Sequence, residues 1–547
     1  MKDYIRINDT DNVIVALREL APGEELVIPA RADGSKADAV SGTEAGAGAA
    51  GRADGSKADA TDRTEEKAAG ELRVTVRERI PAGHKLAVAA VPAGGEVVKY
   101  GSRIGIAKEE IHAGAWVHVH NVKTALDGIS EYVYEPAACV RQADAAEQSA
   151  GPITAAKPGA TFQGYVRTDG SVGVRNEIWV IPTVGCVNGI AEALAREARG
   201  RIRGSVEDVA AFPHPYGCSQ MGDDQEHTRT ILADLVRHPN AGGVLVVGLG
   251  CENSSIGELK RYIGDYDECR VRFLVCQECE DEMAQGAALL DELIHYAAGF
   301  TRESVPAEKL IVGLKCGGSD GFSGITANPL VGRFSDLLIG QGGTTILTEV
   351  PEMFGAETLL MNRCRTEELF QETVSLINDF KQYFMDNHQT IYENPSPGNK
   401  EGGITTLEDK SLGCTQKSGT APVSGVLAYG ERVQAAGLNL LSAPGNDLVA
   451  ATALAASGAQ IVLFTTGRGT PFASPVPTVK IASNGTLAGK KKNWIDFNAG
   501  VVLEEASLAE AGEQLFSYVL SVASGEKVCS ERAGYHDMAI FKQGVTL

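Results

Sequence analysis

The stretch GVLVVGLGC, residues 243–251, decides the fold. It is an apolar run of strand length that ends in a glycine turn, and the helical pattern ENSSIGELKRYI follows it. The same order occurs in IWVIPTVGC (178–186), KLIVGLKCGGSD (309–320) and AQIVLFTTGRGTP (459–471). Strand, glycine turn and helix in alternation predict a parallel α/β architecture, in which functional groups gather at the carboxyl ends of the strands.

The length and composition are those of a multidomain globular protein. A chain of 547 residues predicts two to four domains, and 43% hydrophobic with 22% charged residues is ordinary for such a protein. Lys and Arg number 50 and Asp and Glu 71, so the formal charge is 50 − 71 = −21. This charge repels nucleic acid and anionic membranes, so we expect neither as a partner. A small anionic substrate would need a local cationic site.

The sequence also predicts where the protein is found. It contains no apolar run of 18 residues, and its start, MKDYIRINDTDNVIVAL, lacks the pattern of a signal peptide. We therefore expect a cytoplasmic protein whose 11 cysteines are reduced. CQEC (276–279) is a single CxxC, which is weak evidence for a metal module.

The chain divides into segments of different composition. Residues 1–125 have strand-like alternation and predict a small β-domain, which a flexible insertion at about 31–70 interrupts. The insertion contains RADGSKADA twice, at 31–39 and 52–60, and cannot bury enough apolar surface to offset the entropy cost of ordering it. The remaining boundaries that we expect are a linker at 126–160, an α/β domain at 161–395 and a C-terminal α/β domain at 396–547.

A polar loop, HPYGCSQMGDD (214–224), concentrates groups that can do chemistry. It is an active-site loop in our interpretation, with His214 or Cys218 facing a metal ion or the substrate; the alternative is a polar turn. Cys186, Cys251 and Cys316 each follow an expected strand. Cys186 and Cys251 also precede an expected helix, whose N-terminus favours a thiolate; the alternative is that the turn requires a small side chain.

HVHN (118–121) lies on an expected strand, and alternation would place His118 and His120 on one face as half of a metal site. The alternative is a half-exposed strand face. Arg175 follows an expected hairpin turn and can hold a carboxylate; the alternative is a surface charge. Arg468 lies in TGRGTP (466–471) after an apolar run, where it and backbone N–H groups can cradle an anion; the alternative is a tight turn.

Longer stretches carry a resemblance to a known family. They include residues 173–191, 237–253, 316–336, 344–357, 392–419 and 464–484. With these stretches the chain closely resembles the altronate/galactarate hydro-lyase family over almost its whole length; the insertion at about 31–70 departs from it. The resemblance implies a β-clip domain of the SAF type, followed by a large catalytic region.

The resemblance also implies the activity. It implies loss of water from D-altronate to give 2-dehydro-3-deoxy-D-gluconate in hexuronate (galacturonate) catabolism, with a divalent metal ion, Fe(II) or else Mn(II). Galactarate or another sugar acid is the alternative substrate, and a sugar-acid-binding protein without activity is the alternative of another class. The partner is a small sugar acid, and a homo-oligomer is compatible with the sequence.

Such a reaction needs a base, an acid, a metal ion and cations that hold the substrate carboxylate. Our candidates for the catalytic groups are His214, Cys218, Glu252 and Asp320. Our candidates for substrate binding are Arg175, Lys410, Lys417 and Arg468. Our candidates for metal binding are His118, His120 and Asp224. An iron–sulfur cluster is the alternative cofactor, with Cys186, Cys218, Cys251 and Cys316 as its ligands.

Overall fold

The computed structural model describes residues 2–29, 71–141, 159–504 and 506–547, which form two compact units. Unit 1 comprises Met1–Ala125 and Pro395–Leu412, and unit 2 comprises Leu126–Asn394 and Gly413–Leu547. The predicted insertion at about 31–70 lies outside the described residues, and so do residues 142–158 of the predicted linker. The domain boundaries at 160 and 395 stay predictions. No helix in the described part of the chain is long and apolar enough to cross a membrane.

Unit 1 is the predicted small β-domain. Its strands are β1 (Tyr4–Ile5), β2 (Val13–Ala16), β3 (Glu25–Pro29), β4 (Glu71–Thr75), β5 (Lys85–Ala87), β6 (Glu96–Lys99), β7 (Ser102–Ala107), β8 (Trp116–Val117) and β9 (Val122–Lys123). They form three antiparallel sheets in the orders β1-β2-β5-β8, β3-β4 and β6-β7-β9. β3 and β4 flank the insertion and pair with each other, with Leu26 opposite Val74.

A later segment of the chain completes unit 1. It contains α9 (Pro397–Glu401) and most of α10 (Leu407–Cys414). The Asp409 carboxylate accepts hydrogen bonds from Lys85 at 2.7 Å and Lys99 at 3.1 Å, and all three side chains are buried. Burial alone would raise the pKa of Asp409, but the two ammonium groups outweigh it and hold that pKa well below its usual range.

The predicted strand over residues 118–121 is wrong. β8 ends at Val117 and β9 begins at Val122, so His118 and His120 lie in the turn between them. The reason is Asn121, whose side chain accepts from the His118 N–H at 3.0 Å and donates to the Trp116 carbonyl at 2.9 Å. Such a side-chain bond closes a turn that residue alternation does not reveal.

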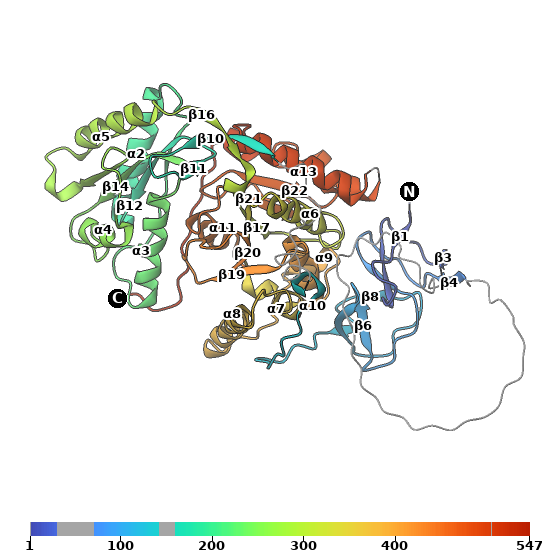
Figure 1. Ribbon diagram of the computed structural model, residues 1–547. Coiled ribbons are helices and arrows are strands. Elements are labelled where there is room, and N and C mark those ends of the chain that lie inside the picture. The colour runs from blue at the N-terminus through green and yellow to red at the C-terminus, as the bar shows by residue number, and fades with distance from the viewer. Residues whose placement is uncertain (1, 30–70, 142–158, 505) are drawn as a thin grey trace, which may run out of the picture. The chain divides into compact units, whose positions relative to one another are not determined.

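Unit 2 contains the predicted parallel α/β architecture in two sheets. The elements of the first sheet are β12 (Glu177–Pro182), α2 (Asn188–Ala198), β13 (Val209–Ala211), α3 (Asp223–Val236), β14 (Ala241–Gly248), α4 (Ile256–Ile263), β15 (Val271–Val275) and α5 (Glu282–Ala297). The strands are parallel in the order β13-β12-β14-β15. Ile178 and Val180 share a core with α2 and α5, whereas Trp179 and Ile181 share one with α3 and α4. The helices therefore cover both faces of this sheet (Figure 1).

The second sheet has seven parallel strands in the order β19-β20-β18-β17-β21-β22-β23. Its strands are β17 (Ile311–Cys316), β18 (Thr344–Leu347), β19 (Val423–Leu427), β20 (Gly437–Leu441), β21 (Ile461–Thr466), β22 (Thr478–Ala482) and β23 (Phe497–Asn498). The helices of this region are α6 (Ala327–Gly340), α7 (Glu357–Met361), α8 (Glu367–Asp386), α11 (Asp447–Ala456), α12 (Gly485–Lys490), α13 (Leu508–Ala523) and α14 (Cys529–Arg532). A small antiparallel sheet, β11-β10-β16, consists of β10 (Thr161–Val166), β11 (Val172–Gly173) and β16 (Arg302–Pro306).

Each parallel sheet has a point where the strand order reverses. In the seven-stranded sheet β17 and β21 are neighbours, and the chain proceeds from β17 to β18 on one side and from β21 to β22 on the other. In the four-stranded sheet β12 and β14 are neighbours, and the chain proceeds from β12 to β13 on one side and from β14 to β15 on the other. In open α/β sheets, ligands bind outside the carboxyl ends of the strands at such points. The two reversal points are therefore candidate binding sites.

Candidate active site

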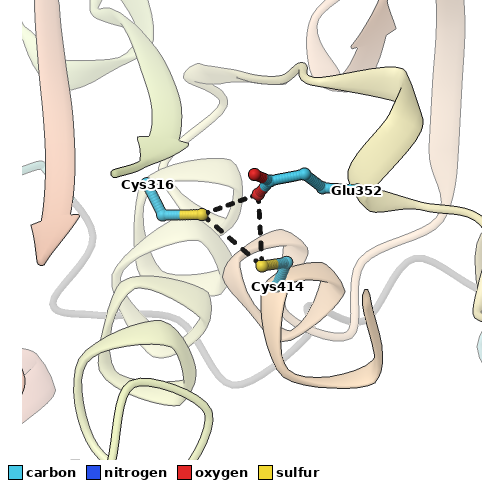
Figure 2. A group of neighbouring side chains, drawn as sticks. All are labelled: Cys316, Glu352 and Cys414. Carbon is cyan, nitrogen blue, oxygen red and sulfur yellow. Dashed lines mark hydrogen bonds between the residues drawn. The ribbon is translucent and has the colours of Figure 1, made fainter. Parts of the chain in front are cut away.

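The reversal point of the seven-stranded sheet holds a buried group of three potential metal ligands: Cys316, Glu352 and Cys414 (Figure 2). Cys316 is the last residue of β17, Glu352 follows β18, and Cys414 ends α10. The two thiols donate to the same carboxylate oxygen, Glu352 Oε2, at 3.0 and 3.3 Å, and their sulfur atoms are 3.5 Å apart. Among the described residues this is the one group of three or more His, Cys, Asp or Glu side chains with ligand atoms within 4.8 Å of one another.

A buried ammonium group accompanies the thiols. Lys417 is 1% exposed, and its Nζ donates to the Cys316 sulfur at 3.0 Å. Burial would lower the pKa of Lys417, but the neighbouring thiols of Cys316 and Cys414 outweigh it, and the pKa is raised. Lys417 therefore stays protonated and can compensate the charge of a thiolate. The hydrogen-bonding contact with the Cys316 thiol, and to a lesser extent burial, raises the pKa of the Cys414 thiol.

A second lysine organises the carboxylates beside this group. Lys315 is fully buried and donates to Glu349 at 3.1 Å and to Asp447 at 2.8 Å. The other oxygen of Glu349 accepts from the Cys316 backbone N–H at 2.9 Å, so both of its oxygens are occupied. Glu349 has φ 70°, a left-handed conformation that is strained for this side chain and is often found at functional sites. Asp447 differs from Glu349 because its side chain is 35% exposed.

Two glycines let the loops at this edge approach each other. A Cβ atom at Gly317 would lie 2.6 Å from an Asp447 carboxylate oxygen, and one at Gly467 would lie 2.2 Å from the Asp320 carboxyl carbon. Asp320 accepts hydrogen bonds from Ser323, Ser483 and Asn484 at 2.8 to 3.0 Å. Although burial raises the pKa of Asp320, these bonds lower it in part, and those from Ser483 and Asn484 tie the loop after β17 to the loop after β22.

The donor set fits a divalent transition metal ion. Two thiolates and a carboxylate are three protein ligands, which is the number that leaves a coordination position open in catalytic sites. Thiolates favour iron or zinc over magnesium or calcium. If both thiols lose their protons when a divalent ion binds, the two new negative charges balance the charge of the ion. The buried site therefore accepts the metal without a net change in charge.

Three of the predicted site residues lie at this edge: Asp320, Lys417 and Arg468. Lys417 lies beside the thiols, whereas the contacts of Asp320 make it a tie between loops. Arg468 is exposed on the loop after β21, and its backbone N–H donates to the Gly318 carbonyl at 3.0 Å.

Other predicted residues lie at the carboxyl edge of the four-stranded sheet. His214 is buried, and backbone groups occupy both ring nitrogens: Nε2 is 2.8 Å from the Pro182 carbonyl, and Nδ1 accepts from the Tyr216 N–H at 3.2 Å. Glu252 accepts from the Thr183 hydroxyl and from the backbone N–H groups of Leu249 and Gly250.

The same loop contains Cys218 and leads to Asp224. Cys218 is exposed and its thiol donates to Asn253 Oδ1 at 3.5 Å. Asp224 is buried and accepts from the backbone N–H groups of Gln543 and Gly544, each at 2.7 Å. Its contacts thus fasten the last residues of the chain to the start of α3.

The remaining predicted residues are Arg175 in unit 2 and three residues of unit 1. Arg175 is fully buried, makes a two-point ion pair with Glu531 at 2.6 and 2.9 Å, and also donates to backbone carbonyls. Lys410, His118 and His120 belong to unit 1. His118 is buried, stacks on Trp116 and contacts Thr405, His120 is exposed, and Lys410 donates to Asn399 at 3.3 Å.

Sequence reasoning singled out Cys316 and Lys417 but missed their partners. The missed residues are Lys315, Glu349, Glu352, Cys414 and Asp447. A signal was present, because Lys315, Glu349 and Glu352 lie at the end of an apolar strand or just after one, where α/β folds place functional groups. Cys414 had no such signal, because it ends a helix.

Comparison with known proteins gives the family. The models described as "D-galactarate/Altronate dehydratase, C-terminal", "D-galactarate dehydratase/Altronate hydrolase, second domain" and "Altronate/galactarate dehydratase SAF domain" match residues 307–546, 164–298 and 57–125. The chain is 49% identical to the altronate dehydratase of Bacillus subtilis and 47% identical to that of Escherichia coli, each over 100% of both chains. It is 34% identical to the galactarate dehydratase (L-threo-forming) of Escherichia coli, over 85% of this chain and 90% of that protein. The predicted SAF domain is confirmed, and the chain belongs to the altronate/galactarate dehydratase family.

Proposed function

We propose that this protein removes water from D-altronate to give 2-dehydro-3-deoxy-D-gluconate, at the carboxyl edge of the seven-stranded sheet. The observation that carries the proposal is the buried Cys316–Glu352–Cys414 group beside Lys417, at the point where the strand order reverses. Altronate is favoured over galactarate because identity to the two altronate dehydratases is 47–49%, against 34% to the galactarate dehydratase. The hydro-lyase activity itself accords with all three relatives.

The reaction needs help because the proton to be removed lies next to a carboxylate. Its removal adds negative charge beside an existing anion, and hydroxide must leave from the neighbouring carbon. A divalent ion, Fe(II) in this proposal, would be held by Cys316, Glu352 and Cys414, and it supplies a Lewis acid for the substrate oxygens. The thiolate-rich donor set favours Fe(II) over Mn(II).

The chain's own residues supply the remaining functions. Asp447 is our candidate for the base, because its side chain is 35% exposed while both oxygens of Glu349 are occupied. Lys315 orients Asp447 through the 2.8 Å hydrogen bond. Arg468, exposed on the loop after β21, is our candidate to bind the substrate carboxylate against the net charge of −21.

The environment that we propose is the cytoplasm. Each of the eleven cysteines is free, which suits a reducing compartment. The partner of the site is a small sugar acid.

The proposal is tested by the formation of keto-deoxy acid from a panel of sugar acids, with and without added Fe(II). We expect the highest kcat/KM with D-altronate and a rate that depends on Fe(II). In Asp447→Asn, we expect kcat to fall by ~10²–10⁴, the usual contribution of a positioned base, while the metal content stays that of the wild type. Equal rates on galactarate would refute the substrate assignment, and a normal kcat in Asp447→Asn would refute the base.

A further inference from the structure

Three exposed cysteines lie at the carboxyl edge of the four-stranded sheet, a site that the proposed function does not use. Cys186 follows β12, Cys218 follows β13 and Cys251 follows β14. β12 and β14 are the neighbours at which the strand order of this sheet reverses. Each of the three loops at this second reversal point therefore carries an exposed thiol.

Specific contacts hold the three loops together. The Gly185 N–H donates to the Tyr216 carbonyl at 2.9 Å, which joins the Cys186 and Cys218 loops. The Ser254 N–H donates to the Gly217 carbonyl at 3.1 Å, which joins the Cys218 and Cys251 loops. Glu252 joins the first and third loops, because one of its oxygens accepts from Thr183 at 2.6 Å and the other from the Gly250 N–H at 2.6 Å.

The three thiols have no role in packing. A fourth cysteine, Cys276, also follows a strand of this sheet, but it packs against the core that Leu290 and Leu293 help to form. Burial raises the pKa of the Cys276 thiol to about 11. In contrast, Cys186, Cys218 and Cys251 are all exposed.

Two buried polar atoms in the same loops lack a partner. The side chains of Gln220 and Ser254 are 2% and 0% exposed, yet Gln220 Nε2 and Ser254 Oγ have no hydrogen-bond partner. Gln220 is two residues from Cys218, and Ser254 is three residues from Cys251. Buried donors are nearly always satisfied, so unsatisfied ones in the loops that carry Cys218 and Cys251 favour a ligand that accepts hydrogen bonds there.

We propose that Cys186, Cys218 and Cys251 bind an iron–sulfur cluster, separate from the metal ion proposed at Cys316. A single tetrahedral ion with metal–sulfur bonds near 2.3 Å needs its sulfur atoms only ~4 Å apart. The three thiols do not meet that requirement, because no group of three containing them lies within 4.8 Å among the described residues. A cubane cluster spaces its cysteine sulfurs further apart, and its inorganic sulfides accept the kind of N–H and O–H bonds that Gln220 and Ser254 can donate.

Three cysteines leave one iron of a four-iron cluster without a protein thiolate. If the three exposed thiols hold such a cluster, that iron would be free to bind water or an oxygen of a small hydroxy acid. We therefore expect the site to bind small oxygen ligands as well as iron and sulfide.

The test uses the full chain, reconstituted under anaerobic conditions with Fe(II) and sulfide. We expect visible absorbance and acid-labile sulfide in the wild type, and loss of both in Cys186→Ser, Cys218→Ser and Cys251→Ser. The matched control is Cys269→Ser, because Cys269 is also exposed but precedes β15, at the opposite edge of the same sheet. That variant should keep the full signal.

Two further results decide the matter. The double variant Cys316→Ser/Cys414→Ser should keep the cluster signal, which separates this inference from the proposed metal ion. No labile sulfide in the reconstituted wild type, or the same sulfide content in the triple variant of Cys186, Cys218 and Cys251, would overturn the proposal. Near-native circular dichroism of each variant shows that a lost signal is not lost folding.

Discussion

At the scale of single residues, two buried histidines have the same surroundings. His214 and His238 each precede a proline, accept a backbone N–H two residues later at Nδ1, and lie near a backbone carbonyl with Nε2. Burial lowers the pKa of His214 to about 4 and that of His238 to about 3. Both rings are therefore neutral at neutral pH, and each fixes a loop.

This predicts how stability depends on pH. The folded-state pKa of His238 lies below the unfolded value of about 6.5. The contribution of His238 to the free energy of unfolding is therefore complete above pH ~6.5, and it is lost as the pH falls toward the folded-state pKa. The loss is about 1.4 kcal/mol per pH unit for one proton. We expect His238→Gln to reduce the slope of unfolding free energy against pH between pH 6.5 and 5. His112→Gln changes an exposed histidine and serves as the control. Equal slopes for His238→Gln and the wild type would contradict this explanation.

Several residue roles could not be predicted from the sequence. HPYGC contains the groups of a site, but whether His214 faces a substrate or the Pro182 carbonyl depends on the path of β12, more than 30 residues earlier. Cys316 was visible as a thiol after a strand, whereas its partners Glu352 and Cys414 lie 36 and 98 positions later. Contacts of that separation form only when the sheet assembles.

At the scale of elements, glycines decide how closely the loops approach. Gly217 has φ 99°, and a Cβ atom there would lie 1.9 Å from the Thr183 carbonyl oxygen. Gly189, in α2, is a contrast, because nothing lies within 4 Å of a Cβ added there. A side chain would therefore clash with the backbone at Gly217, whereas there is space for one at Gly189.

We therefore predict opposite effects of two alanine substitutions. Gly217→Ala should destabilise the protein by ~1–3 kcal/mol, the usual cost of a strained backbone conformation, and should also displace the loop that carries Cys218. Gly189→Ala should be neutral or stabilising by up to ~1 kcal/mol, because Gly189 is the second residue of α2 and alanine is favoured over glycine in a helix. Chemical denaturation of both variants checks this, and a Gly217→Ala protein as stable as the wild type would refute the close approach.

The elements themselves were largely predictable. GVLVVGLGC and IWVIPTVGC became β14 and β12 with their glycine turns, because a short apolar run between breakers has few other structures available. HVHN was predicted incorrectly as a strand, because the side chain of Asn121 closes a turn there. The order of the strands within each sheet was not predictable, since it depends on which edge each crossover returns to.

At the scale of the whole molecule, the insertion at about 31–70 interrupts one pair of strands. β3 and β4 pair in register from Glu25 opposite Thr75 to Pro29 opposite Glu71. Replacing residues 32–69 by a short Gly-Ser bridge should therefore leave this pairing intact. We expect unchanged turnover in the shortened protein, measured at equal folded concentration. A soluble, folded product that has lost most of its turnover would contradict this expectation.

The measurement that tests the central claim most directly is turnover of D-altronate as a function of added Fe(II), for Cys414→Ser and Cys364→Ser. Both thiols are buried, but Cys364 contacts Thr373 and a backbone carbonyl rather than Glu352. If Cys414 is a ligand, Cys414→Ser should need a higher Fe(II) concentration and reach a lower maximal rate, because a hydroxyl replaces a thiolate ligand poorly. Cys364→Ser should follow the wild-type curve. Identical Fe(II) curves for the two variants would contradict a catalytic metal ion at Cys316, Glu352 and Cys414.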